Sequence, residues 1–585
     1  MRITTELTDY QVRYISAILS GKTVQNPELS ELLLQGNDFG NYTINDITNV
    51  LRPQVTKKEQ KAKGITFTPL RLVRYMYENV LSNDVSLADM LNSDIADLSA
   101  GNGAFFVGLF QVLKEHREFS LRAFIEKHIY AYELEASNAA FLELIFKILV
   151  EYFGEDSSDL NIHLTVGDTL KLWRSGTLDR KFDFIVGNPP YVKQQNLDET
   201  QRNFLRHSFD SIVSNYNLYY AFVELSAKLI GDEGRALLLV PNYLLKIKSA
   251  EFLRRFLVDR SYFERIVDFQ FSKLFEGIDT YSMILQINRS SDVVQFKNLE
   301  NLEESKQWTR VSASSLNTES INLVDKEEQR LIDIVKSQPN QLVISTGIAT
   351  LKDKVYLIDK VHENERGQLR FTNSIEDRSF DIEPEVVVPI TKGSGASANT
   401  LPELKYILYP YHVVNGSAFL IDEAEMANSY PQAFAYLQAS KNILASRSGS
   451  YGEGDWYRYG RSQALTRFDS KIVFPTNTDH PKFRFVPEGS LLFNGYSVYG
   501  IENYASSERL LKALTVVLNS SLTDRFMRLT SYYIGSGFLS YQKKYIEKFR
   551  IPELDAEDIE ALISIGECGT DSRINKLVQK IYGIE

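Results

Sequence analysis

Short apolar runs alternate with longer amphipathic stretches between about residues 64 and 290. Seven runs are rich in Ile, Val, Leu and Tyr and have the length of strands; they cover residues 93–100, 127–135, 161–168, 182–188, 234–241, 265–271 and 282–288. Helical patterns lie between several of them, for example at residues 105–116 and 136–153. This alternation predicts an α/β fold with a mixed, largely parallel sheet of seven strands covered on both faces. In such sheets ligands bind beyond the carboxyl ends of the strands.

The pattern changes after about residue 320. Strand candidates become short, aromatic residues are dense, and turn-forming stretches such as residues 391–400 and 446–456 are frequent. A chain of 585 residues is also too long for one hydrophobic core. We therefore expect an N-terminal helical extension (1–50), an α/β domain (51–320), a mixed α+β domain (321–555) and a C-terminal helical tail (556–585).

Composition narrows the class of protein. The chain is 43% apolar and 24% charged and has no long uncharged apolar run, which predicts no membrane span. The first residues do not have the pattern of a signal peptide, so we expect a cytoplasmic protein. The single cysteine, Cys568, excludes an intramolecular disulfide and a zinc site built on several thiolates, and we expect no metal.

The formal net charge of -11 argues against nucleic-acid binding unless basic residues cluster locally. Residues 52–63 hold five Lys/Arg and one Glu, and residues 441–484 hold eight Lys/Arg and four Asp/Glu. For any one of these clusters, solvated surface charge is the simpler interpretation. Together they leave room for a phosphate-binding surface.

Turn and acidic residues follow the first three strand candidates. These residues are Asp97, Ser99, Gly101 and Gly103 at the end of the first strand, Glu133 at the end of the second and Asp168 at the end of the third. Glycine lets a ligand approach the backbone, and an acid at a strand end can bind ribose hydroxyls or an adenine amine. Each feature alone is equally consistent with a plain turn, an exposed acid or a helix N-cap. The 32 residues between Gly101 and Glu133 exceed the nicotinamide spacing and favour another adenosine cofactor.

The fourth strand candidate ends in Asn188-Pro189-Pro190-Tyr191. The two prolines stiffen the turn and remove backbone donors, which leaves the Asn188 amide oxygen and the Pro189 carbonyl as neighbouring acceptors. Such a pair can hold both hydrogens of an aromatic amine and turn its lone pair toward a methyl donor. The alternative is an ordinary Asn-Pro-Pro turn, which becomes less favoured after a buried strand and three cofactor-type strand ends.

With these motifs in place, the chain resembles the γ-order, TaqI-like adenine-N6 DNA methyltransferases. The resemblance covers about residues 64–290 and implies a Rossmann-like class I methyltransferase domain that binds S-adenosyl-L-methionine. It also implies that Thr68 and Pro69 touch the methionine end of the cofactor, Glu133 the ribose and Asp168 the adenine. Leu98 stands where the family has proline, which leaves Asp97 and Gly101 as the safer assignments.

The same resemblance implies how substrate is held. Tyr191 and Phe275 would sandwich an adenine swung out of double-stranded DNA. The C-terminal domain resembles the family's target-recognition domain more weakly. Within its basic stretch we expect Arg458, Arg461 and Lys471 to contact DNA. Phe275 is equally consistent with a core aromatic.

Three alternatives stay open. Cytosine N4 methylation uses the same acceptors but usually follows Ser-Pro-Pro in the family. Protein glutamine or RNA methyltransferases also carry Asn-Pro-Pro-Tyr but resemble a more compact domain. The third alternative is a non-catalytic DNA-binding or defence subunit. For the favoured function we expect a monomer in a restriction-modification system, with any nuclease or defence partner in a separate protein.

Overall fold

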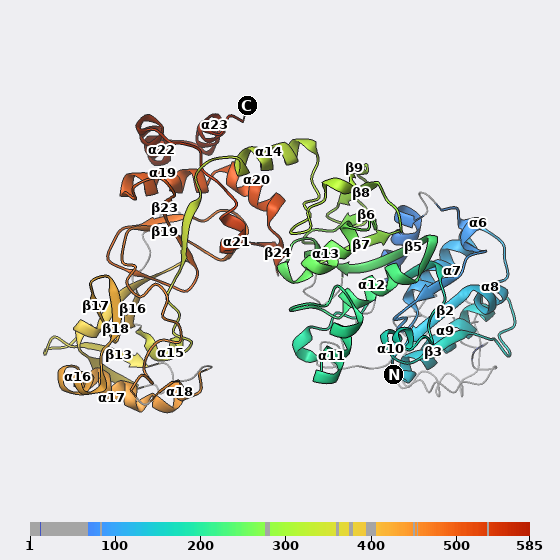
Figure 1. Ribbon diagram of the computed structural model, residues 1–585, viewed down its shortest axis with the longest axis horizontal. Coiled ribbons are helices and arrows are strands. Elements are labelled where there is room, and N and C mark those ends of the chain that lie inside the picture. Colours follow the sequence, from blue (N-terminus) through green and yellow to red (C-terminus); the bar gives the residue numbers. More distant parts are fainter. Residues whose placement is uncertain are drawn as a thin grey trace, which may run out of the picture. The chain divides into compact units, whose positions relative to one another are not determined.

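The computed structural model describes Val12 and residues 68–81, 85–274, 281–358, 362–373, 378–393, 405–447, 451–452, 454–534 and 537–584. The chain forms two compact units, residues 1–325 and 326–585 (Figure 1). The predicted extension at residues 1–50 lies outside the described residues apart from Val12, which packs in the core of the first unit.

A nine-stranded mixed sheet forms the centre of the first unit, in the order β3-β2-β1-β4-β5-β7-β6-β8-β9. The strands β1 to β5 pair in parallel, whereas β7 runs antiparallel to both β5 and β6. The nine strands are β1 (Ile95–Asp97), β2 (Ile129–Glu133), β3 (His163–Val166), β4 (Phe182–Gly187), β5 (Ile230–Pro241), β6 (Phe263–Asp268), β7 (Ser282–Ile287), β8 (Val293–Asn298) and β9 (Thr309–Ser312).

This sheet confirms the predicted α/β class and corrects the predicted number of strands from seven to nine. The first seven strands overlap the seven predicted runs. The two additional strands, β8 and β9, extend one edge of the sheet; β8 alternates buried with exposed or half-buried positions, and β9 buries none of its residues. An edge strand of this kind does not form the continuous apolar run on which the prediction depended.

Alternate residues of the central strands point into two separate cores. On β4, Phe184 and Val186 belong to one core and Ile185 to the other. The first core is covered by α5 to α9 and the second by α10 to α13. Because both faces are covered, the buried parts of the central strands are largely apolar, as in parallel strands generally.

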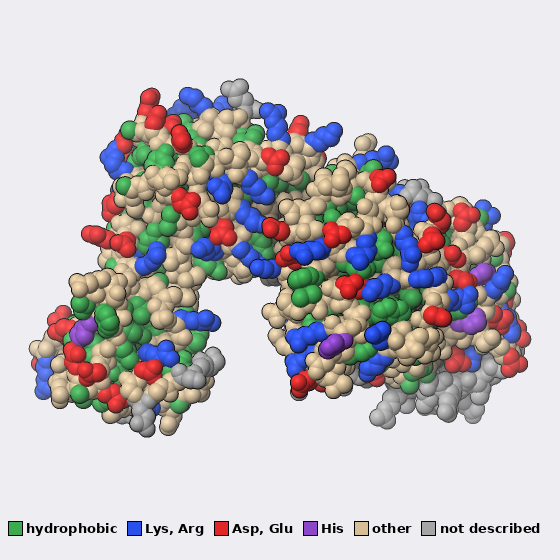
Figure 2. Space-filling view, in the orientation of Figure 1, with side chains coloured by type: hydrophobic (Ala, Val, Ile, Leu, Met, Phe, Trp, Pro, Cys, Tyr) green, Lys and Arg blue, Asp and Glu red, His purple; other side chains and the backbone are tan. Residues whose placement is uncertain are grey.

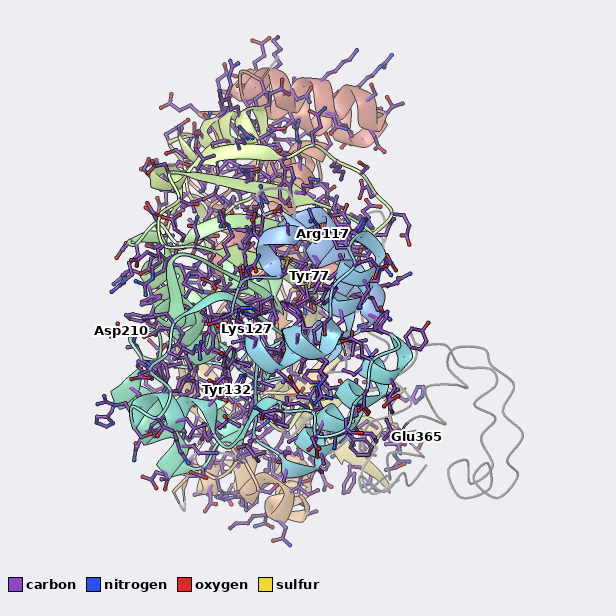
Figure 3. All side chains as sticks on the ribbon, turned by 90° about the vertical axis from the view of Figure 1, so that its right-hand side faces the viewer. Tyr77, Arg117, Lys127, Tyr132, Asp210 and Glu365 are labelled. Atoms are coloured by element: carbon purple, nitrogen blue, oxygen red, sulfur yellow. The ribbon has the colours of Figure 1, made fainter. Side chains whose placement is uncertain are left out.

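The helices of the first unit join successive strands and cover the sheet. They are α5 (Leu70–Tyr75), α6 (Leu87–Met90), α7 (Ala104–His116), α8 (Leu121–His128), α9 (Ala136–Tyr152), α10 (Thr169–Arg174), α11 (Glu199–Ser208), α12 (Tyr219–Leu229) and α13 (Glu251–Val258). A π-helical turn, Met76–Leu81, continues α5. It buries Tyr77, whose hydroxyl donates to the Phe105 carbonyl at 3.2 Å and so ties this turn to α7 (Figure 3).

The second unit combines small, mostly antiparallel sheets with short helices. Its sheets have the orders β10-β23-β19-β21, β11-β16-β15-β22, β12-β13-β14, β17-β18 and β20-β25-β24. Its strands are β10 (Leu342–Thr346), β11 (Leu357–Ile358), β12 (His362–Glu363), β13 (Leu369–Asn373), β14 (Arg378–Ile382), β15 (Val387–Lys392), β16 (Lys405–Leu408), β17 (Tyr411–Val414), β18 (Ser417–Leu420), β19 (Lys471–Phe474), β20 (Asn477–Thr478), β21 (Arg484–Val486), β22 (Leu491–Phe493), β23 (Tyr496–Ile501), β24 (Tyr533–Ile534) and β25 (Phe538–Ser540).

The last helices of the second unit pack on the rest of that unit. They are α14 (Lys326–Lys336), α15 (Asp353–Tyr356), α16 (Glu423–Ser429), α17 (Pro431–Ala439), α18 (Lys441–Ala445), α19 (Glu508–Leu518), α20 (Ser521–Thr530), α21 (Lys543–Ile546), α22 (Ala556–Cys568) and α23 (Asp571–Ile581). The Asn575 side chain accepts from the Ser521 backbone N–H at 2.8 Å, which joins α23 to α20. Within the described ranges, no helix has the length and apolar character needed to cross a membrane.

Arg254 on α13 joins two segments of the first unit that are far apart in the sequence. Its guanidinium is fully buried and donates to the carbonyls of four residues, Leu244, Ile247, Thr318 and Glu319, at 2.5–2.8 Å. The arginine therefore anchors the segment after β5 and the segment at residues 318–319 to the same helix.

We predict that Arg254→Met destabilises the first unit by about 2–4 kcal/mol, because it leaves several buried carbonyls without donors. Urea unfolding measures the change. Arg255→Met is the matched control, since Arg255 is half-exposed and pairs with Glu251 one turn away, an interaction of about 0.5 kcal/mol or less. Equal midpoints for the two variants would contradict the anchoring role.

Candidate active site

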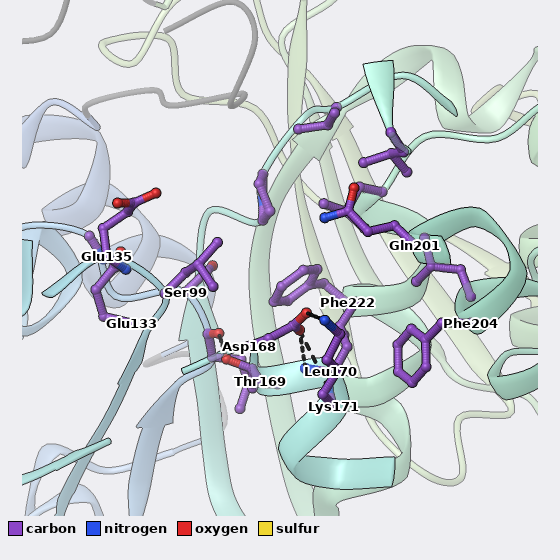
Figure 4. A pocket seen from close by; sticks show the side chains of 18 of the residues that line it. Ser99, Glu133, Glu135, Asp168, Thr169, Leu170, Lys171, Gln201, Phe204 and Phe222 are labelled. Carbon is purple, nitrogen blue, oxygen red and sulfur yellow. Dashed lines mark hydrogen bonds and ion pairs between the residues drawn. The ribbon is translucent and has the colours of Figure 1, made fainter. Parts of the chain in front are cut away.

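A cavity of about 370 Å³ lies at the carboxyl ends of β1, β2, β3 and β4, with α11 and α12 on one side (Figure 4). Six of the residues predicted from sequence line it: Ser99, Gly101, Glu133, Asp168, Asn188 and Pro190. Residues that are up to 91 positions apart in the chain therefore share one wall, as expected when parallel strands end at the same edge. The volume falls in the range of small-molecule sites.

Glu133 and Gly101 join the ends of β2 and β1. One carboxylate oxygen of Glu133 accepts from the Gly101 backbone N–H at 2.8 Å, and the other accepts from the Glu135 N–H and the Asn138 amide. Gly101 has a φ of +56°, which favours glycine, and a Cβ there would meet no atom within 4 Å. The turn thus leaves open space at the rim of the cavity, with an oriented carboxylate behind it.

Asp97 lies directly beneath this turn. Its side chain is buried and accepts from the Ser99 backbone N–H at 2.9 Å. Burial raises the pKa of Asp97 from 3.8 to about 8. A Cβ on Gly187, the last residue of β4, would come within 2.7 Å of an Asp97 carboxylate oxygen. Glycine at this position therefore allows the ends of β1 and β4 to approach each other.

Asp168 has two structural roles at once. It is the N-cap of α10, with its carboxylate accepting from the backbone N–H groups of Leu170 and Lys171, and it lines the cavity (Figure 4). The N-cap interpretation and the ligand interpretation of this acid are thus compatible.

Asn188 is the first residue of the turn that follows β4. Its amide nitrogen donates to the Thr68 hydroxyl at 3.1 Å, which fixes the orientation of the side chain. Its amide oxygen is buried and has no hydrogen-bond partner among the residues that the structure describes. A buried acceptor without a donor is costly, so an orphan of this kind points to a group that a ligand would supply.

The residues from Pro190 to Val192 differ in whether their side chains line the cavity. Pro190 and Val192 line the cavity, whereas Tyr191 is turned away from it and donates to the Leu239 carbonyl at 3.0 Å. The ring of Tyr191 packs edge-to-face on Tyr219, with centroids 5.7 Å apart. Burial raises the pKa of the Tyr191 hydroxyl well above its usual range, so it stays a neutral donor. The aromatic ring is therefore held rigidly on the side opposite Pro190.

The other predicted residues of this region support the site from outside the cavity. Thr68 is buried, and Pro69 precedes the first residue of α5. Gly103 starts α7 with a φ of +79°, where a Cβ would collide with the Leu142 side chain. Pro189 is buried. Phe275 lies outside the described residues.

Sequence analysis missed several residues that line the cavity. Asn138 on α9 contacts Glu133, and Phe204 and Phe222 come from α11 and α12. Phe222 falls in a stretch that matches the family, but no role followed from that match. Phe204 could have been found only from the apolar face of α11, which does not distinguish a cavity wall from a core position.

The three predicted DNA-contacting residues differ in their surroundings. Arg461 is exposed, whereas Arg458 pairs with Asp455 at 2.7 Å and lies over the Tyr451 ring. Lys471 is fully buried on β19, where its ammonium donates to the Ser490 carbonyl and burial lowers its pKa to about 8. A lysine in the core does not reach a phosphate, and we leave Lys471 out of the proposed DNA interface.

Fold and site together define a methyltransferase-like α/β unit joined to a second, mixed unit. Residues 117–275 match the sequence profile of the Eco57I restriction-modification methylase family. The chain is 23% identical over 589 residues to the type II restriction enzyme and methyltransferase RM.Eco57I of Escherichia coli, which covers 86% of this chain and 58% of that protein. It is also 23% identical over 452 residues to the type II methyltransferase M.BstVI of Geobacillus stearothermophilus, covering 70% and 75%.

The fold is similar to that of the type IIL restriction-modification enzyme MmeI, which was solved in complex with DNA. The TM-score is 0.62 at 14% identity, over 99% of this chain and 88% of that one. At this identity the likeness concerns the fold alone. Sequence and fold therefore relate the chain to restriction-modification methyltransferases, although it spans little more than half the length of the Eco57I protein.

The raised pKa of Asp97 predicts a pH-dependent stability. Between its ordinary value of 3.8 and about 8, the folded protein keeps a proton that the unfolded chain releases, so stability falls as pH rises through this window. We expect Asp97→Asn to flatten this slope. Thermal unfolding at several pH values between 5 and 9 measures it. Asp232→Asn, at a highly exposed carboxylate, should retain the wild-type slope. Parallel curves for wild type and Asp97→Asn would contradict the assignment.

Proposed function

We propose that this protein transfers a methyl group from S-adenosyl-L-methionine to the N6 amine of an adenine in double-stranded DNA. The observation that carries the proposal is the buried, unpartnered amide oxygen of Asn188 at the cavity that also holds Glu133 and Asp168. An acceptor without a donor suits a substrate that brings an N–H group. The exocyclic amine of adenine brings two.

The residues present fit an adenosyl cofactor. Glu133 is held by three N–H donors and suits ribose hydroxyls, and Asp168 suits the adenine amine. Ser99 and Gly101 would face the cofactor where the turn is open, and Thr68 and Pro69 would bind its methionine end. When bound, the cofactor supplies an electrophilic methyl group on a sulfonium.

The chain's own part in the reaction is to position a weak nucleophile. The lone pair of an aromatic amine is delocalised into the ring. Two acceptors, the Asn188 amide oxygen and the Pro189 carbonyl, would hold the two amine hydrogens and favour a tetrahedral nitrogen. Thr68 keeps the Asn188 amide in the orientation that presents its oxygen. Tyr191, which lies outside the cavity and is fixed by the Leu239 carbonyl, would provide an aromatic face for the swung-out base beyond the Asn-Pro-Pro turn, with Phe275 on the other side of the base.

Recognition of duplex DNA would fall to the second unit. Basic and acidic side chains are interspersed over both units on the face shown in Figure 2, so the overall charge does not decide where DNA binds. The exposed Arg461 is the better candidate for a phosphate, and Arg458 would contact DNA only after leaving Asp455. The relatives named above include an enzyme solved with DNA, which supports this role. We propose a monomer that acts in restriction-modification or related defence, with any separate nuclease supplied by a partner.

We predict that Asn188→Ala lowers the rate of methyl transfer at least about a hundredfold, because it removes one of the two acceptors. Binding of the cofactor, followed by calorimetry, should change little. Asn138→Ala is the matched control: it loosens Glu133 and should raise the KM for the cofactor more than it lowers kcat. Nucleoside mass spectrometry identifies the product. Detection of N4-methylcytosine in place of N6-methyladenine would mean that the substrate base is cytosine. Unimpaired turnover by Asn188→Ala would refute the mechanism.

We predict that Arg461→Ala weakens binding of duplex DNA and reduces the dependence of log K on log salt by about one, as expected for one lost phosphate contact. Fluorescence anisotropy over a range of salt concentrations measures both quantities. Lys471→Met should leave the affinity and the salt dependence unchanged, because Lys471 is buried. Identical salt dependence for wild type and Arg461→Ala would exclude Arg461 from the interface.

A further inference from the structure

Helix α11 of the first unit forms one wall of the cavity described above. Its residues Gln201, Phe204 and Leu205 line the cavity. In Figure 4, Gln201 and Phe204 lie on the opposite side of the cavity from Ser99 and Glu133. No motif of the sequence analysis falls on this helix, yet it brings an amide and an aromatic ring to the site.

Backbone hydrogen bonds hold α11 in place at both of its ends. Before the helix, the Gln194 backbone N–H donates to the Tyr216 carbonyl at 3.1 Å. After the helix, the backbone N–H groups of Asp210 and Ser211 donate to the two carboxylate oxygens of Glu224, at 3.0 and 2.8 Å. Glu224 is a fully buried residue of α12. The side chains of α11 therefore keep a fixed place in the cavity wall.

A capping box orients the amide of Gln201. The Asp198 carboxylate accepts from the Gln201 backbone N–H at 2.8 Å, and the Gln201 amide oxygen accepts from the Asp198 backbone N–H at 3.2 Å. A capping box alone indicates only a stable helix start. Here it also engages the oxygen and leaves the amide nitrogen, with its two hydrogens, to the cavity (Figure 4). Within the described ranges, no group accepts a hydrogen bond from that nitrogen.

Asp168 and Gln201 bring opposite hydrogen-bonding groups to one apolar cavity. Leu170, Phe204 and Phe222 supply apolar and aromatic wall, which suits a flat ring. The Asp168 carboxylate accepts hydrogen bonds, whereas the Gln201 nitrogen donates them. Adenine matches this pair, because its exocyclic amine donates and its other ring-edge nitrogens accept. A purine with an oxo group in place of the amine would put an acceptor against the carboxylate.

We propose that Gln201 is a specificity-determining residue for the cofactor, and that its amide N–H donates to a ring nitrogen of the cofactor's adenine while Asp168 accepts from the amine of the same ring. The inference rests on the proposed function, which supplies the adenosyl cofactor. The capping box holds the amide before the cofactor arrives, so little side-chain freedom is lost on binding.

The test measures binding of S-adenosyl-L-homocysteine to the full-length protein by calorimetry. The same measurement is made with three analogues in which N1, N3 or N7 of the adenine is replaced by C–H. Gln201→Glu keeps an oxygen for the capping box and removes the N–H donor. We expect it to weaken binding of S-adenosyl-L-homocysteine about tenfold, the scale of one lost hydrogen bond. Wild type should lose about as much for one of the analogues, and for that analogue Gln201→Glu should lose nothing further.

Gln195→Glu is the matched control, because Gln195 is exposed, lies just before α11 and is outside the cavity. It adds the same charge and should bind all four compounds as wild type does. Equal thermal midpoints for Gln201→Glu and wild type show that the helix start is intact. Wild-type affinity of Gln201→Glu for S-adenosyl-L-homocysteine, or the same loss for all four compounds, overturns the inference. Failure of wild type to bind S-adenosyl-L-homocysteine would instead refute the proposed function.

Discussion

The ends of β1 and β4 lie so close together that only glycine fits at position 187. Gly187 ends β4 directly against the buried Asp97 carboxyl, and a methyl group at that glycine would come within 2.7 Å of an Asp97 oxygen. This contact brings the glycine-rich turn after β1 beside the Asn-Pro-Pro turn after β4. The Ser99 hydroxyl, which donates to the Asn188 carbonyl at 3.4 Å, spans the same junction. The cavity depends on this junction, and so does the proposed binding of the cofactor and of the substrate base.

The site places its polar groups on a rigid frame. Asn188 is oriented by Thr68, Glu133 by three N–H donors and Tyr191 by the Leu239 carbonyl. Side chains that are held before a ligand arrives lose little freedom on binding, which is how positioning by itself can favour a reaction. Within the described part of the chain, the buried Asn188 amide oxygen has no hydrogen-bond donor, and it is the group to which the proposed chemistry assigns the substrate.

In the second unit, several basic side chains are already bound by neighbouring groups of the protein. Arg447 stacks on Tyr451, Arg458 pairs with Asp455, and Lys471 is buried against the Ser490 carbonyl. A count of basic residues in residues 441–484 therefore overstates the charge that this stretch can offer to a phosphate.

The sequence by itself determined the α/β class, seven of the nine sheet strands and the strand ends that carry Glu133, Asp168 and Asn188. It could do so because buried parallel strands are apolar throughout and the turns after them keep distinctive residues. Only the tertiary structure decided that β8 and β9 extend the sheet, that Phe204 lines the cavity, and that Lys471 is buried while Arg461 is exposed. Edge strands, cavity walls and the exposure of a cation depend on which distant segments pack beside them, and local patterns of residues do not contain that information.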